Sequence, residues 1–151
     1  MGKRHESREM AVQFLYQWNA TDSNLDEALA LFWGHFDEPP DDETRKFAEA
    51  MVRGVVEHLA AIDEKIRQFA QHWDFERIAA VDRAILRLGI YEMLFRDDIP
   101  PVVSINEAVE IAKKFSTAES GKFVNGILDG VRKDLPRPAR TAAGGAEKKE
   151  S

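Results

Sequence analysis

The sequence predicts an all-α fold, a single compact domain of about seven helices arranged as two helical halves. Apolar residues recur at steps of three or four along most of the chain, which is the spacing of an amphipathic helix. No segment of any length alternates apolar and polar residues, so strands are not predicted. With 151 residues, 44% of them hydrophobic, the chain is long enough to bury one core.

The first half of the chain, residues 1–76, contains three helical stretches: 4–19, 25–36 and 42–69. Asn24 is a suitable N-cap for the second stretch, and two prolines prevent that stretch from continuing. Asp41 or Asp42 can cap the third stretch. Because the third stretch is longer than a typical helix, we expect it to break near residues 58–61.

The second half, residues 77–135, contains a central helix and a C-terminal pair. A connector at 73–75 precedes the helix predicted over 78–96, whose two apolar stripes imply burial against neighbours on two sides. Ser104 and Glu107 have the form of a capping box for the next helix. The final helix is indicated by apolar residues at helical spacing: Phe123, Ile127 and Val131.

Residues 1–135 are therefore predicted to form the folded domain and residues 136–151 a disordered tail, which has almost no large apolar residues. The net charge is −6, but residues 1–18 carry +1 and residues 19–76 carry −9. Any nucleic-acid site must then be a local patch on an acidic body. The acidic middle is a solvated face, which composition favours, or a docking surface for a basic partner protein.

The sequence lacks the residue constellations that catalysis needs. It contains no cysteine, no glycine-rich phosphate-binding motif and no histidine spacing suited to a metal. Glu107 and Glu110 lie near a predicted helix start, where a cap and a surface acid explain them. We therefore expect no enzymatic activity, no metal and no cofactor. The absence of cysteine, of a secretory signal and of a membrane-length apolar run fits a cytoplasmic location.

An aromatic residue and a cation share the side of the first helix that faces away from its predicted core. On a helical wheel, Phe14 and Trp18 lie on the core face, whereas Tyr16 and Arg8 lie roughly opposite. A ring that stacks on a base, beside a cation that holds phosphate, is typical of single-stranded RNA binding. Packing of Tyr16 against another helix is the alternative, and the residues alone favour it, because Val12 lies on the same side.

Four blocks of this sequence resemble the NusB family of bacterial antitermination proteins. They are R-E-x-A-V-Q-x-L-Y at 8–16, F-x-x-x-x-V-x-G-V at 47–55, V-D-R-A-I-L-R-L at 81–88, and the two C-terminal helices with INEAVEIAKKF and GKFVNGILD. The resemblance implies a transcription factor that binds single-stranded boxA-type RNA of ribosomal RNA leader transcripts. It further implies that NusE, a small ribosomal subunit protein, binds alongside, and that the pair helps RNA polymerase resist termination.

The resemblance also implies which residues act. RNA contacts are expected from the first helix and from the start of the last one, at Lys3, Arg4, Arg8, Tyr16, Ser120, Lys122 and Phe123. The segment RHESR at 4–8 departs from the family's usual R-R-x-A-R cluster, because it keeps two arginines and adds an acid, which lowers the expected RNA affinity. NusE is expected to dock before and at the start of the central helix, at Glu76, Asp82 and Arg83.

Two other functions fit the same residues. One is a protein-interaction scaffold that does not touch RNA, which the acidic body permits. The other is a stand-alone relative of the N-terminal helical module of ribosomal-RNA cytosine methyltransferases, whose catalysis needs a second, cofactor-binding domain. A homodimer formed through the partner surface is a further alternative.

Overall fold

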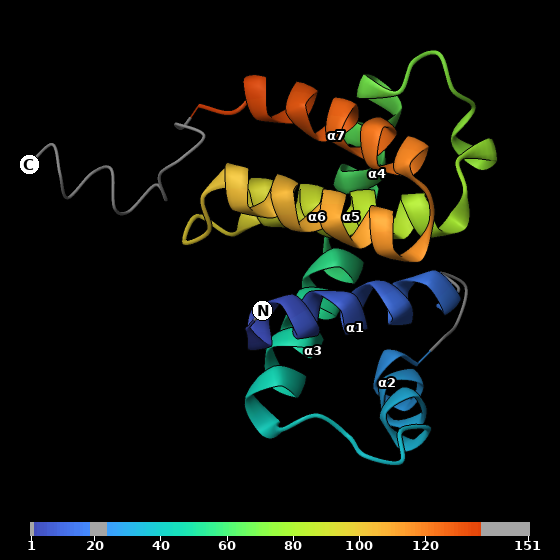
Figure 1. Ribbon diagram of the computed structural model, residues 1–151, viewed down its shortest axis with the longest axis vertical. Coiled ribbons are helices and arrows are strands. Elements are labelled where there is room, and N and C mark those ends of the chain that lie inside the picture. The colour runs from blue at the N-terminus through green and yellow to red at the C-terminus, as the bar shows by residue number, and fades with distance from the viewer. Residues whose placement is uncertain (1, 19–23, 137–151) are drawn as a thin grey trace, which may run out of the picture.

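The computed structural model describes residues 2–18 and 24–136, and in these ranges the chain folds into seven α-helices and one short 3-10 helix, with no strand (Figure 1). The elements, in chain order, are α1 (Lys3–Gln17), α2 (Leu25–Gly34), α3 (Asp42–Glu57), α4 (Leu59–Phe69), η1 (Phe75–Arg77), α5 (Ala80–Phe95), α6 (Pro101–Phe115) and α7 (Ala118–Lys133). The predicted all-α fold is confirmed. The predicted disordered tail lies outside the described residues, apart from Pro136.

The helix boundaries predicted from local signals are mostly correct. The side chain of Asn24 accepts a hydrogen bond from the backbone N–H of Glu27 at 3.0 Å, and that of Asp41 accepts one from Thr44 at 2.9 Å. Both side chains satisfy amide groups that have no partner within the helix. The predicted break in the third stretch occurs at His58, between α3 and α4.

The start of α6 differs from the prediction. The helix begins at Pro101, whose fixed φ and missing N–H suit the first position of a helix. Ser104 therefore lies inside α6, where it is buried and its hydroxyl donates a hydrogen bond to Glu92 Oε1 at 2.7 Å. The expected capping box of Ser104 with Glu107 is wrong, because the proline starts the helix three residues earlier.

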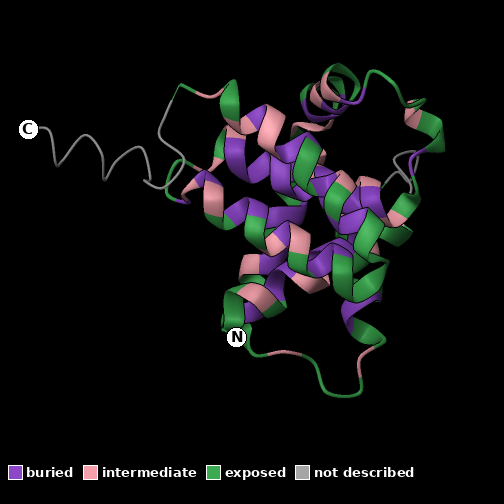
Figure 2. Ribbon diagram, turned by 45° about the horizontal axis from the view of Figure 1, so that its top comes forward, coloured by how far each residue is buried: buried purple, intermediate pink, exposed green. Residues whose placement is uncertain are grey.

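The central helix α5 contacts α1, α3, α4, α6 and α7. In Figure 1, α1, α2 and α3 lie on one side of the molecule, and α4 to α7 lie on the other. The sequence predicted that the first half ends after Glu76. In the structure the two halves divide at His58, because α4 packs against α5 and α7. The two halves meet along α5, which is why most of that helix is buried. Figure 2 shows that the buried residues gather where the helices face one another.

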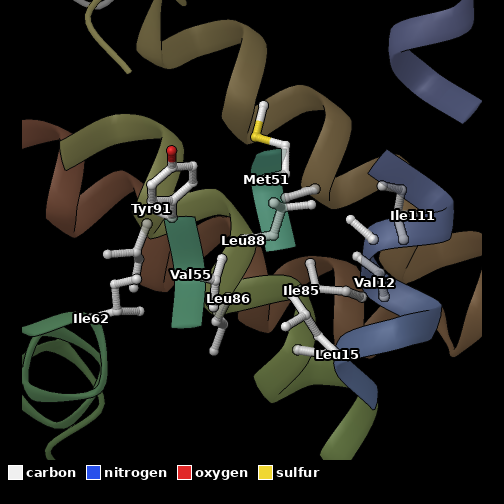
Figure 3. Close-up of a cluster of buried hydrophobic side chains, with 14 of the residues drawn as sticks. Val12, Leu15, Met51, Val55, Ile62, Ile85, Leu86, Leu88, Tyr91 and Ile111 are labelled. Carbon is white, nitrogen blue, oxygen red and sulfur yellow. The ribbon is translucent and has the colours of Figure 1, made fainter. Parts of the chain in front are cut away.

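Side chains from α1, α3, α4 and α6 meet those of α5 in the core (Figure 3). Leu86 and Ile90 are completely buried, with 0% of each residue exposed. Gly54 allows α3 to cross close to α5, because a Cβ at this position would overlap the ring of Tyr91. Among the described residues, no helix combines the length and the apolar character needed to cross a membrane.

Acid should weaken the start of α3. The pKa of Asp41 is lowered to about 2, first by the hydrogen bond from Lys3 and then by the hydrogen bonds from Thr44. A carboxyl whose folded-state pKa is lowered stabilises the fold above its ordinary pKa, and this contribution is lost as the pH falls toward the folded-state value. We expect Asp41→Ala to lower the melting temperature at pH 7 and to lose this effect between about pH 4 and pH 2.

Asp42→Ala is the matched control, because Asp42 lies in the first turn of the same helix but is not its N-cap. We expect a smaller decrease in melting temperature for this variant. An Asp41→Ala effect of equal size at pH 7 and at pH 2 would contradict the proposed role of the ionised carboxylate.

Candidate nucleic-acid interface

A buried ionic network joins α1 to α5 and α6. The Arg8 guanidinium donates from Nε and Nη2 to the two carboxylate oxygens of Glu92, at 2.8 and 2.9 Å. Its Nη1 also donates to Glu107 Oε1 at 3.3 Å, and Ser104 donates to Glu92. The side chains of Arg8 and Glu92 are only 5% and 2% exposed. The paired, two-point geometry fixes both the position and the rotation of α1 against α5.

The same network continues to the surface along α6. His5 lies between two carboxylates, with its Nδ1 3.0 Å from Glu107 and its Nε2 3.0 Å from Glu9. Lys114 then donates to Glu9 Oε2 at 2.9 Å. Because residue 5 pairs with residue 107 and residue 9 with residue 114, α1 and α6 run side by side in the same direction, as Figure 1 also shows.

Arg8 therefore does not lie where the helical wheel had placed it. The wheel treated the side opposite the core face of α1 as solvent, but α5 and α6 cover that side, and Arg8 is only 4% exposed. Burial lowers the pKa of Arg8, but the hydrogen bonds and charges of Glu92 and Glu107 raise it more, so the net shift is upward. The structure thus gives Arg8 the role of positioning α1.

The other predicted residues of α1 lie at its two ends. Lys3 is paired with Asp41 at 2.9 Å and with Glu43 at 3.3 Å. The Arg4 guanidinium lies 3.9 Å from the ring centroid of Phe47, in cation–π contact. Tyr16 is 55% exposed near the other end, so the packed alternative for its ring is wrong. Tyr16 lies thirteen positions after Lys3, which corresponds to about 20 Å along a helix.

The predicted residues of α7 line a cleft of about 440 Å³. The cleft lies between the start of α7 and the segment at 73–82 that leads into α5. Phe123 meets the ring of Trp73 edge to face, with centroids 5.2 Å apart. Lys122 and Arg77 also line the cleft, and their side chains are 77% and 86% exposed. Two aromatic rings and two exposed cations therefore gather around one hollow.

Asp82 also lines this cleft, against the expectation that it docks a protein partner on an open surface. It is 7% exposed, and its Oδ2 accepts a hydrogen bond from the Ser120 hydroxyl at 3.2 Å. Ser120 is positioned by Thr117, which caps α7 and accepts from the Ser120 backbone N–H at 3.0 Å. Burial raises the pKa of Asp82, and the hydrogen bond from Ser120 opposes this shift.

The other two residues expected to bind the partner have different environments. Glu76 is exposed in η1. Arg83 is half-buried and donates to the backbone carbonyls of Phe75 and Ile78, each at 3.3 Å, so it holds the connector against α5. Of the three, only Glu76 presents its side chain openly.

Trp73 and Arg77 were not among the residues predicted to bind RNA, because residues 73–75 were expected to be a connector. The signal by which both could have been found is an aromatic residue followed four positions later by a cation. In the part of the chain that the structure describes, no group of three or more acidic, histidine or cysteine side chains could hold a metal ion.

Comparison with known proteins identifies the family. The model of the NusB family matches residues 5–133. The chain belongs to the NusB family. A protein of Methylacidiphilum infernorum named transcription antitermination protein NusB is 52% identical over 140 residues, which cover 92% of this chain and 96% of that protein.

Solved structures of NusB proteins share this fold. The structure of T. maritima NusB matches with a TM-score of 0.78 at 38% identity, covering 98% of this chain and 97% of that one. A chain of the complex of the antitermination factors NusB and NusE with double-stranded RNA matches with a TM-score of 0.77 at 28% identity, covering 88% of this chain and 98% of that one.

Removal of Arg8 should destabilise this NusB-family fold strongly. Loss of one partner from a buried ion pair leaves a buried charge without compensation, at a cost of about 3–5 kcal/mol. We expect Arg8→Met to lower the free energy of unfolding in urea by this amount. The double variant Arg8→Met/Glu92→Leu should lose less, because no buried charge remains unpaired.

Arg53→Ala is the control, because Arg53 pairs with Asp26 at 2.7 Å on the surface, where side chains are 48% and 77% exposed. Its effect should stay within about 1 kcal/mol. If Arg8→Met were no more destabilising than Arg53→Ala, the buried pair would not fix α1.

Proposed function

We propose that this chain is a transcription antitermination factor that binds single-stranded boxA-type RNA of ribosomal RNA leader transcripts together with NusE. The pair would help RNA polymerase resist termination, and the chain itself would be non-catalytic. The observation that carries the proposal is membership of the NusB family over residues 5–133, combined with a cleft whose rings and cations suit single-stranded RNA.

The proposed RNA surface has its main part at one end of the molecule. The end of α1, which carries Tyr16, and the start of α7, which carries Lys122 and Phe123, lie on the same side in Figure 1. Tyr16 would stack on one base, and Phe123 with Trp73 would receive another. Lys122 would attract the intervening phosphates, together with Arg77.

A second part of the RNA surface is proposed at the start of α1. Arg4 is exposed, and the cleft that it lines with Lys3 and Phe47 has a volume of about 440 Å³. The cation–π contact with Phe47 holds the Arg4 guanidinium in place and leaves its N–H groups available to a phosphate. Lys3 contributes less, because Asp41 and Glu43 already neutralise it.

NusE is proposed to dock beside the RNA cleft, around Glu76. Residues 19–76 carry a net charge of −9, which suits a basic ribosomal protein. Arg83 supports this surface from beneath by binding two carbonyls of the connector, and Asp82 borders it from the cleft. A basic partner in this position would bring additional cations close to the bound RNA.

Truncation of Tyr16 should weaken RNA binding without unfolding the protein. We expect Tyr16→Ala to weaken binding of a fluorescently labelled single-stranded boxA-type RNA by about 1–3 kcal/mol, the contribution of one stacked base. The melting temperature should hardly change, because the side chain is 55% exposed. Tyr16→Phe is the matched control and should retain most of the affinity. Unchanged affinity of Tyr16→Ala would exclude Tyr16 from the RNA surface.

The salt dependence should reveal that the RNA site is shared with the partner. The exposed cations of this chain neutralise about three phosphates, so the logarithm of the binding constant should fall with the logarithm of salt with a slope of about −2. Addition of NusE should increase the affinity and make the slope steeper. Equal affinity and equal slope with and without NusE would contradict the shared site. If the chain bound no RNA either alone or with NusE, the result would favour a protein-interaction scaffold that does not touch RNA.

A further inference from the structure

Three guanidinium groups surround the ring of Phe47. The Cζ of Arg4 lies 3.9 Å from the ring centroid, that of Arg96 5.4 Å and that of Arg8 5.8 Å. All three distances lie within the range of cation–π attraction. Two of the arginines belong to α1 and the third directly follows α5. Hydrophobic packing alone does not require cations around a phenyl ring, so the ring of Phe47 does more than fill space.

Phe47 lies at the edge of the core. It precedes Met51 and Val55 at steps of four on α3, so the three side chains share one face of the helix. Met51 and Val55 are fully buried, whereas Phe47 is half-buried and lines the cleft at the start of α1. The ring therefore packs against the core and also faces the cleft in which Arg4 lies.

Carboxylates engage two of the three guanidiniums. Arg8 binds both oxygens of Glu92, and Arg96 binds both oxygens of Asp98 at 2.9 Å. The pKa of Asp98 is lowered first by the hydrogen bond from Arg96, and the charge of Arg4 contributes less. Arg4 is the most exposed of the three arginines, and its contact with the ring is the shortest. The ring thus holds the guanidinium that is most accessible to a ligand.

We infer that Phe47 is a positioning residue of the RNA surface, whose ring holds the Arg4 guanidinium where its N–H groups meet a phosphate. The inference rests on the proposed RNA-binding function. A long side chain that moves freely must be ordered when it binds, which lowers affinity, and a ring that orders it beforehand removes part of this cost. An aromatic residue is needed, because an aliphatic side chain has no negative π face.

A double-mutant cycle between Phe47 and Arg4 tests this inference. The measured quantity is the dissociation constant of a fluorescently labelled single-stranded boxA-type RNA, from anisotropy titrations at low salt. We expect Phe47→Leu to weaken binding by about two- to tenfold, the ordering cost of one long side chain. Arg4→Gln should also weaken binding. In the Arg4→Gln background, Phe47→Leu should have no further effect, because the guanidinium that the ring positions is absent. Phe47→Tyr keeps a ring and should keep the wild-type affinity.

Lys3→Gln is the matched control for the cycle. Lys3 precedes Arg4 and lines the same cleft, but its ion pairs are with Asp41 and Glu43. Phe47→Leu should therefore weaken RNA binding equally in the Lys3→Gln background and in the wild-type chain. Arg4→Lys should weaken binding although the charge is unchanged, because lysine lacks the planar guanidinium that stacks on a ring. Since Arg4 is exposed, this variant tests the contact even if Phe47→Leu does not fold, which thermal melting establishes.

Three results would overturn the inference. Wild-type affinity of folded Phe47→Leu, or of Arg4→Lys, would show that the contact does not assist binding. An equal loss from Phe47→Leu with and without the Arg4 guanidinium would show that the ring acts on the position of α1. Unchanged affinity of Arg4→Gln would remove this end of α1 from the RNA surface. In each case the wild-type chain still binds RNA and the proposed function stands, whereas no RNA binding by the wild-type chain, alone or with NusE, refutes both.

Discussion

The ion pair between Arg8 and Glu92 is the constraint on which the position of α1 depends. Both groups are buried, so each needs the other, and the two hydrogen bonds between them are satisfied only when α1 has one rotation and one position along α5. Two side chains of α6 join this pair by hydrogen bonds, Ser104 to Glu92 and Glu107 to Arg8, so three helices meet at one charged centre. Hydrophobic packing alone tolerates small shifts of a helix, whereas this geometry does not.

The position of α1 in turn determines where its polar ends lie. Lys3 and Arg4 come to the side of α3, against Asp41 and Phe47. Tyr16 comes to the end of the molecule at which α7 begins. The network from His5 through Glu9 to Lys114 holds the direction of α1 along α6. A structural ion network inside the protein is therefore the reason that the proposed RNA-binding groups face solvent at defined places.

The charge distribution explains how an acidic protein can present an RNA surface. Many cations of this chain form ion pairs within the protein. Arg8 pairs with Glu92, and Arg87 donates two hydrogen bonds of 2.9 Å to Asp63. Even the exposed cations at the α7 cleft face a neighbouring acid, Arg77 with Asp74 at 4.0 Å and Lys122 with Glu119 at 3.7 Å, so electrostatic attraction is modest. In the proposed RNA surface, aromatic stacking would then supply a large share of the binding, and the partner would supply further positive charge.

Local signals in the sequence predicted the helices, a cap at Asn24, a cap at Asp41 or Asp42, and a break within 58–61, because a helix and its capping side chain involve neighbouring residues only. The family resemblance added the two-part fold and the class of function. Tertiary structure decided the roles of Arg8 and Asp82, because burial depends on which helices cover a face, and a helical wheel of one helix does not contain that information. It also brought Trp73 to Phe123, fifty positions apart in the chain, and so formed the cleft.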